Sequence, residues 1–228
     1  MKMLRWISVT SCLFLALTPL CANAGEVAEW RAGRATTSTG GLLLPDARGG
    51  FDLVLENAAG VKIGGKPTVG KDTKSIEFSG SQLAPFKTSR PFPSLGGKSK
   101  ISLAFKPADV APADDGTILR YGTQWELRYS AKLGKLSFII WDVEKNFTIA
   151  TVVADAGSWH EAEATFDGST MRLEVGGQVD EKPVVAAIFV EPREPNLVLG
   201  ASRPNTTGEA GIDIRPFAGS VADIQISD

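Results

Sequence analysis

The sequence predicts an all-β fold of two stacked antiparallel sheets. After residue 42 the chain is a series of short runs rich in β-branched and aromatic residues, and Gly, Pro, Asn and Asp separate these runs. Apolar residues at helical spacing are absent over any useful length. So many short strands in one chain favour two stacked sheets over a single open sheet.

The N-terminal residues have the order of a secretory signal peptide. Lys2 and Arg5 precede an apolar run, Trp6–Leu17, and the small residues Ala22–Ala24 follow it. The run is shorter than the roughly 18 apolar residues that span a bilayer, and no later segment is longer. We therefore expect residues 1–24 to be a signal peptide, and the mature protein to be exported to the periplasm or the extracellular medium without a membrane span.

Both cysteines, Cys12 and Cys21, lie within this N-terminal segment. The mature chain is therefore expected to have no disulfide, although export would permit one. Lipid attachment at Cys21 is the alternative to cleavage after Ala24, but the preceding residues Thr18–Leu20 lack the pattern of a lipidated cysteine. The fold is expected to depend on its hydrophobic core alone.

The charge of the chain is balanced. It has 24 basic and 26 acidic residues, and no block of one sign occurs. Binding to nucleic acid needs a basic stripe or patch. We therefore expect no nucleic acid among the partners.

Residues 42–228 are predicted to form one domain, which is long enough to bury a substantial core. Residues 25–41 precede it. Their part from Arg31 onward is rich in Thr, Ser and Gly without an apolar period, which predicts an exposed lead-in. The Pro-rich stretch Ala84–Pro93 and the stretch Glu191–Pro195 are interpreted as loops between strands.

Alternation of apolar and polar residues predicts the strands and their buried faces. Ala162, Ala164 and Phe166 share one face of a strand, whereas Glu161 and Glu163 share the other. The predicted strands are Phe51–Glu56, Ser75–Phe78, Lys100–Lys106, Thr117–Tyr121, Gln124–Ser130, Lys135–Trp141, Phe147–Val153, His160–Phe166, Met171–Val175, Asn196–Leu199 and Ser220–Ile226.

The segment Ser158–Gly177, SWHEAEATFDGSTMRLEVGG, contains a Trp-His strand, an aromatic-Asp-Gly turn and a strand that ends in a Gly-containing turn. It resembles the signature of the laminin G-like branch of the concanavalin A-like lectin/glucanase superfamily. Further segments follow in the order of that family: PDARGGFDLVLENA from Pro45, SIEFSGSQLA from Ser75, NLVLGAS from Asn196 and PFAGSVADIQISD from Pro216. The resemblance implies a two-sheet antiparallel jelly-roll sandwich with one concave sheet.

This superfamily includes lectins, glycosidases, lyases and plain interaction domains, so the function has to be argued from sites. Glucanases with this fold carry Glu-x-Asp-x-x-Glu on one strand, so that a nucleophile and an acid face the substrate together. Glu161-x-Glu163 is the nearest match, but the rest of the motif is missing and we interpret it as a solvated strand face. We therefore expect no enzyme activity.

The only histidine, His160, belongs to the Trp-His signature and is interpreted as structural. With no cysteine in the mature chain, most zinc sites and Cys-His nucleophiles are ruled out, and no cofactor is expected. Calcium is the exception that the resemblance allows. Asp114-Asp115-Gly116 is the most acidic loop, although an Asp-Gly pair is also ordinary turn chemistry.

Sugar binding on a sheet commonly uses an exposed aromatic ring, with polar groups around it for the hydroxyls. Trp141 is the candidate, because Phe138 and Ile140 occupy the opposite face of its strand. The alternative is that a loop covers Trp141. The polar residues expected around it are Glu126, Arg128, Asp142 and Asn146, whereas Trp125, Tyr129 and Trp159 are assigned to the core.

The sequence thus predicts an exported, non-catalytic recognition module for carbohydrate of the cell envelope or the extracellular matrix. Two alternatives remain open: a protein–protein interaction or structural module of the envelope, and a glycan-active hydrolase or lyase. The expected partner is a glycan or an envelope protein, and the sequence does not fix the oligomeric state.

Overall fold

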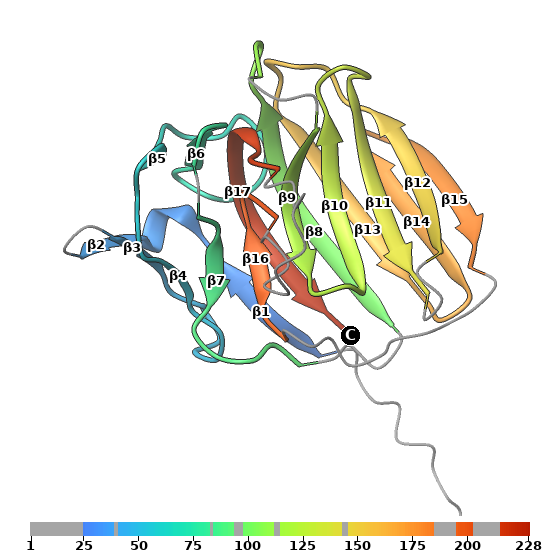
Figure 1. The fold of residues 1–228 in the computed structure, drawn as a ribbon, viewed down its shortest axis with the longest axis horizontal. Helices are drawn as coiled ribbons and strands as arrows, with labels where there is room; N and C mark the ends of the chain where they lie inside the picture. The colour runs from blue at the N-terminus through green and yellow to red at the C-terminus, as the bar shows by residue number, and fades with distance from the viewer. Residues whose placement is uncertain are drawn as a thin grey trace, which may run out of the picture.

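The computed structural model describes residues 25–38, 41–82, 84–93, 98–111, 115–142, 146–184, 195–202 and 215–228. These residues form two antiparallel sheets stacked as a sandwich (Figure 1), so the predicted all-β fold of two sheets is confirmed. The expected signal peptide, residues 1–24, lies outside them. In the described part of the chain no helix is long and apolar enough to cross a membrane.

Sheet A contains eight strands in the described part of the chain. Their spatial order is β15 (Gln178–Pro183), β14 (Thr170–Val175), β13 (His160–Phe166), β8 (Ser99–Pro107), β17 (Ala218–Ser227), β6 (Ile76–Ser79) and β5 (Val61–Ile63), and β1 (Glu26–Trp30) also pairs with β17. β17 pairs with β8 along one side, and with β6 and then β1 along the other. The last strand therefore joins the early and late parts of the chain.

Sheet B contains nine strands in the same described ranges. Their order is β12 (Phe147–Val153), β11 (Lys135–Trp141), β10 (Trp125–Ser130), β9 (Asp115–Tyr121), β16 (Leu197–Leu199), β7 (Phe86–Thr88), β4 (Leu53–Leu55), β3 (Gly41–Leu44) and β2 (Thr36–Ser38). A short 3-10 turn, η1 (Ala32–Arg34), follows β1. In Figure 1 the layer of β9 to β12 lies in front of β8, β13 and β14.

The strands β11, β12 and β13 have the predicted bounds, and the other predicted strands occur within a few residues of theirs. The sequence pattern does not reveal β1, β2, β3, β5, β7 or β15. β15 is missed because nearly all its side chains are exposed, so its sequence does not alternate between apolar and polar residues. β7 lies inside the stretch Ala84–Pro93 that was interpreted as a loop. Of the other expected loop, only Pro195 lies within the described residues.

The core lies between the sheets and is built from the residues that alternation predicts. Phe166 and Leu173 of sheet A are buried there, as are Trp125 and Tyr129 of sheet B. Trp159 is a correction, because it is only half-buried and is not part of the core cluster. It precedes the first residue of β13, so the alternation of that strand does not fix its direction.

The expectation that residues 25–41 form an exposed lead-in holds for Gly33, Arg34, Thr36 and Thr37 but is wrong for β1 and Ala32, which are part of the sandwich. β1 pairs with the C-terminal part of β17. Trp30 at the end of β1 is fully buried, and its Nε1 donates a hydrogen bond to the carbonyl oxygen of Phe51 at 2.7 Å. The sandwich therefore includes the chain from Glu26 onward.

Asp46 ties this N-terminal strand to the loop that follows β3. Its buried carboxylate accepts hydrogen bonds, at 2.9–3.0 Å, from the backbone N–H groups of Glu29, Arg48, Gly50 and Phe51. A buried N–H group without an acceptor costs free energy, so one carboxylate stabilises several chain segments together.

Asp180 connects the sheets where the edge strands β12 and β15 meet. Its Oδ2 accepts a hydrogen bond from the backbone N–H of Thr151 at 2.8 Å, and its Oδ1 lies 2.9 Å from the Nζ of Lys182. Burial acts to raise the pKa of Asp180, but these hydrogen bonds and the charge of Lys182 outweigh it, so the pKa lies below its usual value. The carboxylate thus satisfies an edge N–H group that would otherwise be open to another strand.

Candidate functional site

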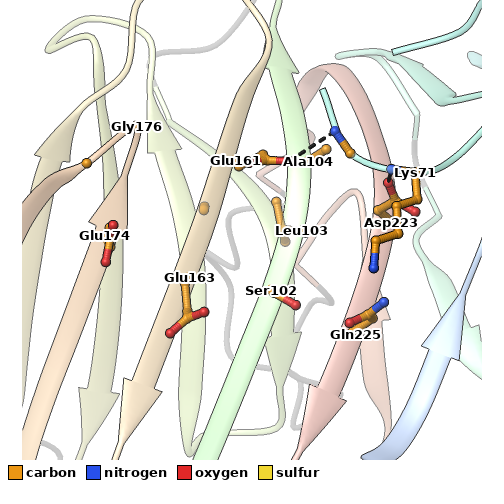
Figure 2. Close-up of a pocket in the computed structure, with 13 residues that line it drawn as sticks. Lys71, Ser102, Leu103, Ala104, Glu161, Glu163, Glu174, Gly176, Asp223 and Gln225 are labelled. Carbon is orange, nitrogen blue, oxygen red and sulfur yellow. Dashed lines mark hydrogen bonds between the residues drawn. The ribbon is translucent and has the colours of Figure 1, made fainter. Parts of the chain in front are cut away.

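A groove of about 720 Å³ lies on the outer face of sheet A, away from the core (Figure 2). It runs over β14, β13, β8 and β17, and the loop between β5 and β6 (residues 64–75) borders it. The polar side chains that line it are Lys71, Ser102, Glu161, Glu163, Glu174, Asp223 and Gln225.

Strand register sets a row of polar side chains across this groove. Glu163 of β13 has Glu174 of β14 on one side and Ser102 of β8 on the other. Gln225 of β17 continues the row beyond Ser102. Figure 2 shows Glu163, Ser102 and Gln225 at the same level on three adjacent strands. A ligand lying in the groove therefore meets carboxylate, hydroxyl and amide groups in one line.

The neighbouring row has small side chains in its middle. Glu161 pairs with Ala104, and Ala104 pairs with Ala222 of β17. Successive residues of a strand point to opposite faces, so Ser102 and Ala104 both lie on the outer face of β8. Their short side chains leave the sheet surface low between β13 and β17, and this creates the groove.

The loop between β5 and β6 reaches across β17 and β8 to β13 at the level of Ala104. The N–H of Gly70 donates a hydrogen bond to Glu161 Oε1 at 3.0 Å (Figure 2). A Cβ placed on Gly70 would lie 3.5 Å from the Cβ of Ala104 and would collide with the carboxylate of Asp223. The φ of Gly70 is also positive, at 76°. The loop backbone therefore lies directly on the sheet, in a conformation and space that only glycine fits.

Asp223 holds the same loop from an irregular position in β17. Its Oδ2 accepts hydrogen bonds from the backbone N–H groups of Lys71 and Asp72. The strand has a bulge between Ala222 and Gln225, where its partner changes from β6 to β1, and Asp223 there has a φ of 49°. A left-handed backbone at a residue other than glycine is strained and persists only where the surrounding structure enforces it. The bulge thus directs the Asp223 carboxylate toward the loop.

The groove is acidic. Its lining has four carboxylates, of Glu161, Glu163, Glu174 and Asp223, against the single amine of Lys71. At its border Glu163 Oε2 lies 2.7 Å from Lys100 Nζ, and Glu174 Oε2 lies 2.5 Å from Arg172 Nη2. Both of these Glu side chains remain 37% exposed. Ion pairs of this kind orient the carboxylates without sealing them from a ligand.

No sequence-family model matches the chain, and no curated protein sequence matches it. Solved structures do resemble it. The botulinum neurotoxin serotype D binding domain matches with a TM-score of 0.57 at 13% identity, over 89% of this chain and 48% of that one. The botulinum neurotoxin type G receptor-binding domain matches with a TM-score of 0.57 at 8% identity, over 90% and 48%.

A serotype D ligand-binding domain in complex with N-acetylneuraminic acid matches with a TM-score of 0.57 at 13% identity, over 89% of this chain and 47% of that one. The fold is a concanavalin A-like sandwich. This chain spans about half the length of each of these domains. At such identities the likeness shows the fold alone, and the chemistry has to come from the residues of this chain.

The residues predicted to bind sugar lie on the outer face of sheet B, on the other side of the concanavalin A-like sandwich. Trp141 is half-buried and lies outside the core cluster, as alternation predicts. The guanidinium of Arg120 lies 5.5 Å from its ring centroid. Asn146 donates hydrogen bonds to Asp142, from its backbone N–H at 2.8 Å and from its Nδ2 at 3.1 Å. The structure thus brings Trp141, Asp142 and Asn146 together at one end of β11.

Glu126 does not reach the surface of the sandwich, which corrects the expectation that it contacts a sugar. Its side chain has no exposed area. It accepts a hydrogen bond from Thr117 Oγ1 at 2.6 Å, and two from Arg128, from Nε at 3.0 Å and from Nη2 at 2.8 Å. Alternation gives the face on which a residue lies but not what covers it. Here Thr117 and Arg128 both donate hydrogen bonds to the fully buried Glu126 carboxylate.

Several arginine side chains surround the buried carboxylate of Glu126. Burial lowers the pKa of Arg120, the charge of Glu126 raises it, and the charges of Arg128 and Arg215 lower it further. Glu126 is therefore packed close to several guanidinium groups. We interpret this cluster as structural, because a buried cation without an anion beside it is costly.

Glu161 and Glu163 lie on a solvated strand face, as predicted, and this face also lines the groove. The glucanase pattern nevertheless stops there. Its last Glu position falls on Phe166, which is buried in the core of the sandwich. The signal that sequence reasoning missed is the combination of Glu161-x-Glu163 with the small outward residues Ser102 and Ala104 of the neighbouring strand.

His160 has structural contacts. Its Nε2 lies 2.8 Å from the carbonyl oxygen of Asp155, and its ring centroid lies 5.4 Å from that of Phe105. In the expected acidic turn, Asp115 and Gly116 are the first residues of β9, whereas Asp114 lies outside the described residues. Among the residues that the structure describes, no group of three or more His, Cys, Asp or Glu side chains is arranged to hold a metal ion.

Proposed function

We propose that this chain is an exported, non-catalytic glycan-recognition module of the laminin G-like branch, and that the groove on sheet A is its binding site. The observation that carries the proposal is an open groove with small residues as its floor and carboxylate, amide and hydroxyl groups along it. Such groups accept and donate hydrogen bonds to sugar hydroxyls. The similar solved structures are receptor- and ligand-binding domains, and the hairpin of β13 and β14 forms where the signature predicts it.

The charge of the groove selects the kind of glycan. One similar structure is a complex with N-acetylneuraminic acid, which is an anion. The groove of this chain has four carboxylates against the amine of Lys71 and the border cations Lys100 and Arg172, so its net charge is negative and disfavours an acidic sugar. We propose that the groove binds a neutral glycan, or one that carries protonated amines.

Two features support binding over catalysis. A glycosidase needs two carboxyl groups placed on either side of the scissile bond. Glu163 is paired with Lys100, and Glu161 holds the backbone of Gly70. Both carboxylates thus already have a positioning task, and Phe166 replaces the third acid of the motif.

The test is a binding panel of three charge classes. Malto- and chito-oligosaccharides represent neutral chains, glucosamine oligosaccharides represent cationic chains, and sialylated oligosaccharides represent anionic chains. We expect saturable binding of neutral or cationic chains, and weaker binding after Glu163→Gln or Glu174→Gln. Glu56→Gln is the matched control, because Glu56 is an exposed carboxylate that follows β4 in the other sheet.

Two results would overturn the proposal. One is a panel in which only sialylated chains bind, since the groove charge could not explain it. The other is a panel in which no chain binds. Hydrolysis of a bound chain during the titration would instead favour the glycan-active enzyme, and chromatography of the recovered oligosaccharide detects it.

A second candidate function is protein binding, and one observation favours it. Phe147 of β12 is 61% exposed and is the cross-strand partner of Trp141, and Val153 of the same strand is 46% exposed. These side chains give the outer face of sheet B an apolar edge. A blank glycan panel, together with capture of a purified envelope protein that Phe147→Ser abolishes, would favour this function.

A further inference from the structure

The loop between β5 and β6 closes one end of the groove between β13 and β17, and Gly176 and Gly177 line the groove on the other side of β13. The backbone of Gly70 lies on Ala104 and is bonded to Glu161, which blocks the floor between β13 and β17. The N–H groups of Lys71 and Asp72 are bonded to Asp223 on the far side. In Figure 2 this loop passes over the end of the groove above Ala104. The loop is thus fixed to two strands and forms an end wall.

The opposite end continues into a second hollow. This hollow, of about 240 Å³, shares Ser102 and Gln225 with the groove and is also lined by Lys100, Ser227 and Glu26. The register of the strands explains the continuation. Lys100 of β8 pairs with Ser227 of β17, next to the pair of Ser102 and Gln225 and on the side away from the wall. A chain in the groove can leave in this direction, toward β1.

We infer that the groove recognises the end of a glycan chain rather than an internal stretch. This inference rests on the proposed function. The terminal sugar unit lies against the Gly70–Asp72 wall, and the following units pass Ser102 and Gln225 into the second hollow. Between β13 and β17 an internal unit cannot lie against the Gly70–Asp72 wall, because the chain on its far side would have to pass through the loop backbone.

The chemistry of the closed end fits a chain terminus. Glu161 lies at the wall, and Glu163 lies one row away from it, whereas Asp223 Oδ2 is bonded to the wall and its Oδ1 is buried. A terminal sugar unit has one more free hydroxyl than an internal unit, and a hydroxyl is a hydrogen-bond donor. A carboxylate accepts such a donor in a charge-assisted hydrogen bond, which is stronger than a neutral one. The open end has the cation of Lys100 as well as the carboxylate of Glu26, so its charges balance and it selects less for donors.

The experiment measures how many protein molecules bind to one chain as its length increases. Malto-, chito- and glucosamine oligosaccharides of increasing length are titrated with the wild-type protein in a calorimeter. We expect one protein per chain at every length, because each chain has one end of the recognised type. Chemical blocking of that end should weaken binding by about tenfold or more, the factor that one lost charge-assisted hydrogen bond gives.

A variant that frees the wall gives the reciprocal result. Asp223→Gly keeps the left-handed backbone without strain and removes the carboxylate that holds Lys71 and Asp72. We expect the number of proteins bound per chain to rise with chain length for this variant. Asp223→Asn is the control, because Asn tolerates the same backbone conformation and keeps an oxygen acceptor, so its binding should stay at one protein per chain.

The outcomes separate this inference from the function on which it rests. Wild-type binding whose stoichiometry rises with chain length would overturn end recognition and leave glycan binding in place. Equal affinity for blocked and free ends would do the same. Absence of binding to every chain would overturn the glycan function and the inference together. The wild-type titrations decide the matter even if Asp223→Gly fails to fold.

Discussion

Replacing Glu126 with Ala should destabilise the protein by about 3–5 kcal/mol, the usual cost of removing one partner from a buried ion pair. Glu126 has no exposed side-chain area, and three hydrogen bonds from Thr117 and Arg128 end on its carboxylate. Without it, the guanidinium groups of Arg128 and Arg120, whose charges act on each other, lose the anion that neutralises them. Repulsion between these cations adds to the loss of the hydrogen bonds.

Denaturant unfolding followed by tryptophan fluorescence measures this change, and the melting temperature should fall by roughly 6–20 °C for a chain of this size. Glu163→Ala is the matched control, because its partly exposed ion pair with Lys100 contributes at most about 1 kcal/mol. If Glu126→Ala unfolds like the parent protein but loses glycan binding, the structural interpretation of Glu126 is refuted and the residue is a ligand contact.

Three further predictions concern the fold. Trp30→Ala should cost about 3–5 kcal/mol because it empties a fully buried site, and unfolding at the parent's denaturant midpoint would contradict this. Asp46→Ala should cost about 2–4 kcal/mol in the same assay, because it leaves four backbone N–H groups without their acceptor. Asp180 has a lowered pKa in the folded state, so its stabilisation is complete above the unfolded pKa of about 3.9 and is lost as the pH falls through the folded pKa. Asp180→Asn should therefore be less stable than the parent near pH 7 and equal to it in strong acid, whereas a pH-independent difference would show that its charge is not involved.

The sequence allows the central strands to be predicted because their two faces differ in polarity. In β13 the buried Ala164 and Phe166 alternate with Glu163 and Thr165, so one pattern gives both the strand and its orientation. β1 gives no such pattern, because its five residues end in Trp30, whose partners on β17 and near Phe51 are distant in the chain. Short strands at sheet margins depend on these tertiary contacts rather than on local preference.

The groove could not be predicted, because it forms where long side chains are missing from the surface of the sheet. The short side chains of Ser102 and Ala104 form the floor, and a loop from elsewhere in the chain lies against Ala104 and borders the groove. The alternation of residues in β8 does not indicate that loop. The position of the loop depends on the bulge at Asp223, near the C-terminus. Alternation placed Trp141 outside the core cluster, but not the guanidinium of Arg120 that packs against its ring.

One pair of titrations decides which face of the sandwich binds glycan. Ser102→Trp fills the floor of the groove on an outward position of β8, where a strand tolerates an aromatic residue. Trp141→Ala removes the aromatic ring from the outer face of sheet B. Both variants are titrated, under identical conditions, with the oligosaccharide that binds the parent protein most tightly. Binding should be abolished by Ser102→Trp and retained by Trp141→Ala. Binding that survives Ser102→Trp but is lost in Trp141→Ala would move the site to sheet B and contradict the assignment of the groove.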